Sequence, residues 1–273
     1  PCAKIASKRI LGTGKMAFRF RAFKHAEDRL PVACILALSA LDFILSNSHL
    51  LGHYFFAMIV PKSQICAWNH HHQHAPTFLR SSLNRLLEFF YALHTGVTTN
   101  LWVLHHNYGH HEHYLDQSKD ERRWQRKDGS TMGELEYSLN VAATSYWRGY
   151  QVGENFPAER NTFVLFSAIT FFMLASLIWY KPIPALFLFV LPMPMGLFMT
   201  AWATFEHHSG LSTDNPYEAS FNNLNRWYNL FTGNLGYHTA HHHNGGLHWS
   251  KLPRLHACLA DKIPDSLIRR TWV

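Results

Sequence analysis

Two long apolar stretches follow each other almost without interruption in the second half of the chain. Residues 162–180 read TFVLFSAITFFMLASLIWY, residues 182–205 read PIPALFLFVLPMPMGLFMTAWATF, and only Lys181 separates them. Each has about the 20 residues that a helix needs to cross the hydrocarbon core of a bilayer. A soluble protein rarely contains an uncharged core helix of this length that is followed at once by another. The pair therefore predicts a helical hairpin within a membrane.

Two shorter apolar blocks lie nearer the N-terminus, at residues 30–45 and 50–60. They contain Asp42, His49 and His53, so they could form two tilted spans or one hairpin. With the later pair, they predict an all-α integral membrane protein with about four transmembrane helices. We expect residues 1–273 to form a single domain.

The distribution of charge predicts how the chain is oriented. Residues 1–29 contain eight Lys or Arg against Glu27 and Asp28, directly before the first apolar block, and they lack a signal-peptide pattern. The positive-inside rule places such a flank in the cytoplasm, and an even number of spans returns the C-terminus to the same side. The net charge of +7 fits contact with anionic lipids. No nucleic-acid-binding motif is present, so we expect no nucleic-acid partner.

Histidine is the second dominant feature, with 21 of the 273 residues. Neutral imidazole is the commonest protein ligand for transition metals, and one ion takes about four to six ligands. The clustered histidines are enough for two ions side by side. The cysteines show no C-x-x-C spacing and predict neither disulfides nor a cysteine-based zinc site. The histidine clusters are HHHQH (70–74), HHNYGHHEH (105–113), EHH (206–208) and HTAHHH (238–243).

The spacing within the clusters is typical of helices, on which residues three or four apart share a face. His70 and His74 have this spacing, as do His106 and His110. His111 lies about 100° around a helix from His110, so this adjacent pair can point at two neighbouring metals. The H-x-x-H-H of residues 238–242 forms one further imidazole patch. With the predicted topology, all clusters lie at span ends, on a cytoplasmic helical cap.

These motifs resemble the histidine boxes of the membrane fatty-acid desaturase and hydroxylase superfamily. The boxes are H-x(3,4)-H, H-x(2,3)-H-H and (H/Q)-x(2,3)-H-H, which here read HHHQH (70–74), HNYGHH (106–111) and HTAHH (238–242). EHHSG at 206–210 resembles the additional histidine that members carry after their last span. The resemblance covers roughly residues 30–256.

The resemblance implies a ligand set for two metal ions, and nearby polar residues are candidates for orienting the imidazoles. The implied metal ligands are His70, His74, His106, His110, His111, His207, His238, His241 and His242. The candidate orienting residues are Glu112, Glu206, Asn107 and Asp116.

The sequence departs from the family pattern at one position, and it leaves the roles of several other histidines open. Acyl-CoA desaturases place an asparagine four residues before the additional histidine, where this chain has Ala203; Glu206 or water could replace that ligand. His71 is an alternative to His70 in the first box. We expect His49 and His53 to line a pocket or form hydrogen bonds. The histidines expected to be solvated or to support the ligands are His72, His105, His113, His208 and His243.

The implied function is an O₂-dependent oxidoreductase with two non-haem iron ions that acts on a fatty acyl or related lipid chain. Desaturation is the expected reaction, and decarboxylation to a terminal alkene and hydroxylation of an alkane or lipid are alternatives. Because no flavin or nicotinamide motif is present, electrons are expected from a separate ferredoxin, or from a small cytochrome with its reductase.

Two other classes fit the sequence less well. A zinc hydrolase is expected to carry H-E-x-x-H, whereas residues 106–110 read HNYGH. A metal transporter would place its ligands near the bilayer midplane, whereas these clusters lie beyond the span ends.

Overall fold

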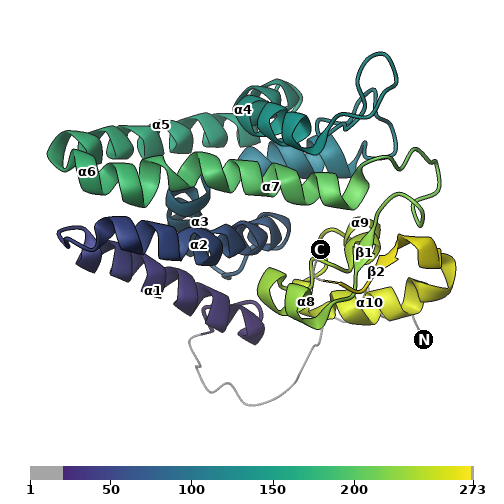
Figure 1. The fold of residues 1–273 in the computed structure, drawn as a ribbon, viewed down its shortest axis with the longest axis horizontal. Helices are drawn as coiled ribbons and strands as arrows, with labels where there is room; N and C mark the ends of the chain where they lie inside the picture. Colours follow the sequence, from purple (N-terminus) through teal and green to yellow (C-terminus); the bar gives the residue numbers. More distant parts are fainter. Residues whose placement is uncertain (1–20, 272–273) are drawn as a thin grey trace.

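The structure, a computed structural model, describes residues 21–271 and shows a bundle of helices with a smaller C-terminal segment at one end (Figure 1). Most of the basic flank predicted at residues 1–29 lies outside the described residues. The bundle contains η2 (Ala26–Asp28), α1 (Arg29–Leu45), α2 (Leu51–His74), α3 (Ser81–Thr95), η3 (Val103–His111), α4 (Glu134–Val152), α5 (Pro157–Tyr180), α6 (Pro182–Ala185), η4 (Leu186–Val190) and α7 (Pro192–His208).

The two long apolar stretches form a hairpin of α5 and the continuous run α6–η4–α7 (Figure 1). Pro182 stands at the start of α6, where the missing N–H of proline removes no helical hydrogen bond, and Pro192 lies within the run, where α7 follows the π-helical turn of η4. Both arms are long and apolar enough to cross a membrane, yet only 17% and 33% of their most apolar windows are buried within the protein. Their apolar surface therefore lies largely outside the core, which favours contact with lipid.

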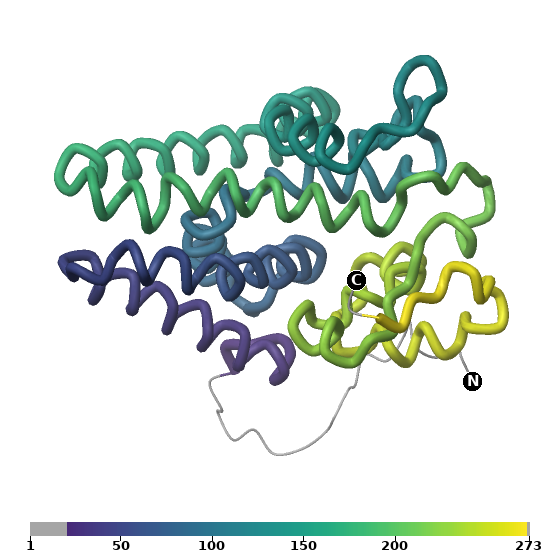
Figure 2. The backbone as a smooth tube through the Cα atoms, in the orientation of Figure 1, coloured from purple at the N-terminus to yellow at the C-terminus, as the bar shows by residue number. Residues whose placement is uncertain are grey.

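The two shorter apolar blocks form a second antiparallel pair, α1 and α2, and α3 packs against both pairs and joins them (Figure 2). Asp42 is buried between α1 and α2, where it accepts hydrogen bonds from Lys62 Nζ at 2.9 Å and Tyr54 Oη at 2.7 Å. This pairing explains how a carboxylate is retained in an apolar block. Among residues 21–271, only the α5 and α6–α7 arms have the length and composition of a span, so four spans remain a prediction.

The C-terminal segment lies beyond the ends of α2 and α7 (Figure 1). It contains β1 (Asn222–Asn223), α8 (Arg226–Thr232), α9 (His238–His243), η5 (Trp249–Lys251), α10 (Leu252–Leu259), η6 (Ala260–Lys262), η7 (Asp265–Leu267) and β2 (Ile268–Arg269). The two strands form a parallel pair in which Asn222 is opposite Ile268. The Asn222 side chain accepts a hydrogen bond from the backbone N–H of Thr239 at 3.0 Å. This bond fixes the start of α9, which carries the last histidine box.

Candidate metal centre

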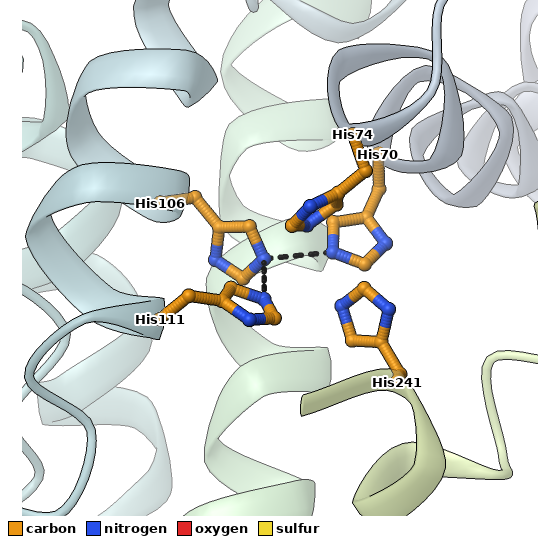
Figure 3. Close-up of side chains that lie close together, drawn as sticks. All are labelled: His70, His74, His106, His111 and His241. Atoms are coloured by element: carbon orange, nitrogen blue, oxygen red, sulfur yellow. Dashed lines mark hydrogen bonds between the residues drawn. The ribbon is translucent and has the colours of Figure 1, made fainter. Parts of the chain in front are cut away.

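Five histidines from three separate segments converge on one point (Figure 3). His70 and His74 come from the last turns of α2, His106 and His111 from η3, and His241 from α9. One ring nitrogen of each lies within 4.8 Å of the others. Residues from the first, second and third histidine boxes therefore meet in a single cluster, the first cluster.

The π-helical form of η3 decides which histidines of the second box face this point. In a π-helix the hydrogen bonds run from i to i+5, so the turn is wider and residues five apart fall on one face. His106 Nε2 accordingly lies 3.1 Å from His111 Nε2. The sequence prediction assumed α-helical spacing and paired His106 with His110. In the structure His110 belongs to an adjoining group of histidines, although its ring still stacks on that of His106 with centroids 5.2 Å apart.

His110 belongs to a second cluster, with His208 from the end of α7 and His242 from α9. His208 Nε2 lies 3.0 Å from His242 Nε2 and 3.0 Å from His238 Nε2, so His238 borders this cluster. The two clusters adjoin, because the stacked rings of His111 and His242 have centroids 4.1 Å apart. The arrangement can hold two metal ions side by side.

Hydrogen bonds donated by the outward ring nitrogens orient His110 and His208 of the second cluster. Asp120 accepts from His110 Nδ1 at 2.9 Å, and the Ala219 carbonyl accepts from His208 Nδ1 at 2.9 Å. In both histidines Nδ1 therefore carries the proton, and Nε2 presents its lone pair to the cluster. Such bonds to the outward nitrogen are typical of metal-binding histidines.

The nitrogens of both clusters have the properties expected of metal ligands. His106 Nε2 lies 2.7 Å from His70 Nε2 and 3.1 Å from His111 Nε2. Each ring nitrogen of a neutral imidazole carries either one N–H or one lone pair, so His106 Nε2 can form a good hydrogen bond with only one of these neighbours. Neighbouring nitrogens about 2.1 Å from a shared metal lie about 3.0–3.4 Å apart, close to these contacts. Further buried nitrogens without a hydrogen-bond partner are His74 Nε2, His110 Nε2 and His241 Nε2.

Burial also sets the protonation state of these rings. It lowers the pKa of His106 well below the usual histidine value, and the nearby Arg122 cation lowers it further. The pKa of His241 is lowered in the same way, by burial and by neighbouring imidazoles. These rings are therefore neutral at physiological pH, the form that binds metals.

His207, a predicted ligand, lies outside both clusters. Its Nδ1 donates to the Phe221 carbonyl at 3.1 Å, and its Nε2 lies 3.1 Å from the Tyr228 hydroxyl, so both ring nitrogens have partners. Its ring stacks on His238 with centroids 3.9 Å apart. The adjacent His208, expected to be solvated or supporting, reaches the second cluster instead.

The other additional histidines belong to neither cluster, although the ring of His71 lies beside that of His70, with centroids 5.5 Å apart. His71 Nε2 donates to the Thr232 carbonyl, His72 contacts Thr77 and Glu88, and His105 is fully buried. His243 is exposed and stacks on Tyr217. His49 and His53 are exposed near the far end of α2. His53 and His70 are 17 residues apart on α2, which corresponds to about 25 Å along the helix axis.

Within residues 21–271, none of the candidate orienting residues forms a hydrogen bond with a histidine of either cluster. Glu206 pairs with Arg269 at 2.8 Å, Asn107 donates to the Gln73 carbonyl, and Asp116 binds Ser118 and Lys119. Glu112 is exposed. The carboxylate that does orient a cluster histidine is Asp120, in the segment after the second box. Its position ten residues after His110 gives no helical-spacing signal that could have identified it.

An apolar cavity of about 290 Å³ opens onto the first cluster and onto His238. His70 and His106 line one part of it, and Met199, Ala203 and Leu235 supply apolar wall. A second cavity of about 270 Å³ lies between α2 and α7 and shares the lining residues Ser63 and Met199 with the first. Together they provide space for an extended alkyl chain beside the histidines.

Comparison with known proteins agrees with this arrangement. A family model described as Fatty acid desaturase matches residues 31–273. No curated protein and no solved structure matches the chain. The resemblance inferred from the histidine boxes is thereby confirmed, and with the two apolar helices it indicates a membrane-associated protein. The chain belongs to the fatty acid desaturase family and is an enzyme of the desaturase and hydroxylase kind that acts on a lipid or acyl substrate.

Proposed function

We propose that the protein is an O₂-dependent oxidoreductase that uses two iron ions to oxidise a fatty acyl or related lipid chain, with desaturation as the expected reaction. The observation that carries the proposal is the pair of adjoining histidine clusters beside an apolar cavity. Iron is redox-active and accepts nitrogen ligands, whereas zinc is redox-inert.

The first iron would be held by the five histidines of the first cluster, and the second by His110, His208, His242 and His238. When bound, the iron pair supplies the redox chemistry that reduces O₂ and removes hydrogen from an unactivated C–H bond. The electrons come from a separate ferredoxin, or from a small cytochrome with its reductase.

The residues of this chain have two tasks around that chemistry. The apolar walls of the cavity hold the alkyl chain beside the clusters and exclude water. Asp120 and the Ala219 carbonyl keep His110 and His208 in the tautomer that directs Nε2 inward. We further propose that both termini and the clusters lie on the cytoplasmic side, as the charge distribution predicts.

Product analysis of the iron-loaded protein tests the proposal. The protein is reconstituted with a reductase system and O₂, given fatty acids, acyl thioesters and alkanes, and the products are identified by mass spectrometry. We expect about two irons per chain and an internal alkene. An alcohol would assign hydroxylation, and a terminal alkene one carbon shorter would assign decarboxylation. No O₂-dependent product, with two irons bound and their reduction verified, would refute an oxidase acting on lipids.

A further inference from the structure

A buried arginine borders the cavity without a carboxylate partner. Arg122 lies between η3 and α4 and is 3% exposed. Its Nη1 donates to the Thr204 hydroxyl, and its guanidinium lies 5.1 Å from the centre of the Trp102 ring. No carboxylate among residues 21–271 forms an ion pair with it. Asp120, two residues earlier, pairs with His110 and accepts from the backbone N–H of Arg122, and its charge acts on the guanidinium without a direct ion pair.

This environment leaves the guanidinium incompletely satisfied. Its Nε is buried and has no hydrogen-bond partner. Burial lowers the pKa of Arg122 to about 10, so the side chain is still cationic at neutral pH. A buried cation with no carboxylate bonded to it is costly, and a carboxylate is the partner that the planar guanidinium binds best, through two parallel hydrogen bonds.

The same cavity contains the space that such a ligand requires. Arg122 and His106 both line it, next to the apolar side chains of Met199 and Leu235. A long-chain carboxylate suits this lining, because its charged end can bind the cation and its alkyl chain can contact the apolar walls. The second cavity, which begins at Ser63 and Met199, extends the apolar path away from the arginine.

We infer that Arg122 binds the carboxylate of a free fatty acid in the cavity beside the first histidine cluster. The inference rests on the proposed function, because the cavity is taken to receive the lipid chain. It fixes the direction in which the substrate lies: the carboxyl end is at the histidines and the methyl end is in the second cavity. The carbons beside the clusters are then those nearest the carboxyl group.

Ligand binding measured without turnover tests the inference separately from the oxidation chemistry. Iron-loaded protein in nanodiscs is kept under argon without an electron donor, and empty nanodiscs correct for partition into lipid. The dissociation constants of laurate, lauryl alcohol, methyl laurate and lauroyl-CoA are compared. We expect the wild type to bind laurate at least about tenfold more tightly than the alcohol or the ester, because a charge-assisted hydrogen bond to a buried guanidinium is lost in both.

Variants locate the effect at Arg122. Arg122→Met should weaken laurate binding about ten- to hundredfold and leave the alcohol and the ester unchanged. The neighbouring Arg123, which lines neither cavity, gives the matched control Arg123→Met, which should bind all ligands as the wild type does. Arg122→Lys keeps the charge near Trp102 and serves if the methionine variant does not fold; it should weaken laurate alone, by several-fold.

Three outcomes would overturn the inference. The first is equal wild-type affinity for laurate and lauryl alcohol. The second is a loss of affinity in the Arg122 variants that is the same for all ligands, which would assign a structural role to the contacts with Thr204 and Trp102. The third is tight binding of lauroyl-CoA that depends on Arg122 as strongly as laurate binding does. A protein that binds laurate through Arg122 but oxidises nothing would refute the proposed function and leave this inference standing.

Discussion

Replacing His208 with alanine should remove one metal from the protein, whereas replacing the adjacent His207 should leave both. His208 Nε2 lies 3.0 Å from the Nε2 atoms of both His238 and His242, at the centre of the second cluster. Its loss reduces the proposed second site from four imidazoles to three. We expect the iron content to fall from about two to about one per chain, with the loss of at least about 99% of the activity, because the proposed chemistry needs both ions.

His207 provides the matched comparison because it precedes His208 on the same helix and is also buried. His207→Ala removes two hydrogen bonds, to the Phe221 carbonyl and the Tyr228 hydroxyl. The expected cost is about 1–3 kcal/mol of stability, with two irons retained.

Iron per chain, measured by mass spectrometry after desalting, is compared with the melting temperature of each variant. One iron in His207→Ala and two in His208→Ala would refute the assignment of ligands. Equal iron contents in both variants would refute it as well.

Four further predictions follow from the site. Asp120→Asn should lower iron affinity and activity about ten- to hundredfold, seen in metal titrations and kcat, because the carboxylate that orients His110 is lost; unchanged affinity would refute this role. Ser63→Phe should narrow the junction of the two cavities and shift products to shorter chains in mass spectra, and an unchanged distribution would mean that the second cavity does not receive the chain. Gly236→Ala should lower the melting temperature and the iron content, since the new Cβ would lie 2.1 Å from the Asn223 carbonyl oxygen, and wild-type values would contradict the tight turn before α9. The metal-free protein should lose stability as the pH falls below about 6.5, by up to about 1.4 kcal/mol per pH unit for each histidine kept neutral by burial, such as His106 and His241; melting temperatures that are flat between pH 7 and 5 would contradict it.

The sign of that pH effect follows from where the protons bind. The pKa of each buried histidine is lower in the folded state than in the unfolded chain, so unfolding takes up protons once the pH falls below the unfolded value. Folding stability is therefore full above that value and decreases as the solution becomes more acidic.

The long apolar hairpin and the convergence of the histidine boxes could be predicted from the sequence because both depend on pattern. Apolar length predicts helices such as α5, and clustered imidazoles predict ligands. The choice between His207 and His208 depends on the rotation of α7 by one residue, about 100°, which tertiary packing sets. The π-helical turn that groups His106 with His111 has no sequence signal of its own. Asp120 approaches His110 through the course of a loop, which helical spacing does not describe.

His110 and His111 are neighbours in the chain, and so are His241 and His242, yet each pair is divided between the two clusters. One peptide unit on η3 and one on α9 thus link the sites, and each fixes its two Cα atoms about 3.8 Å apart. Filling either site orders backbone that also carries ligands of the other, so the entropic cost of the second metal is partly met when the first one binds. We therefore expect the two sites to load cooperatively, so that a titration with less than two metals per chain gives fewer single-metal proteins than two independent sites would.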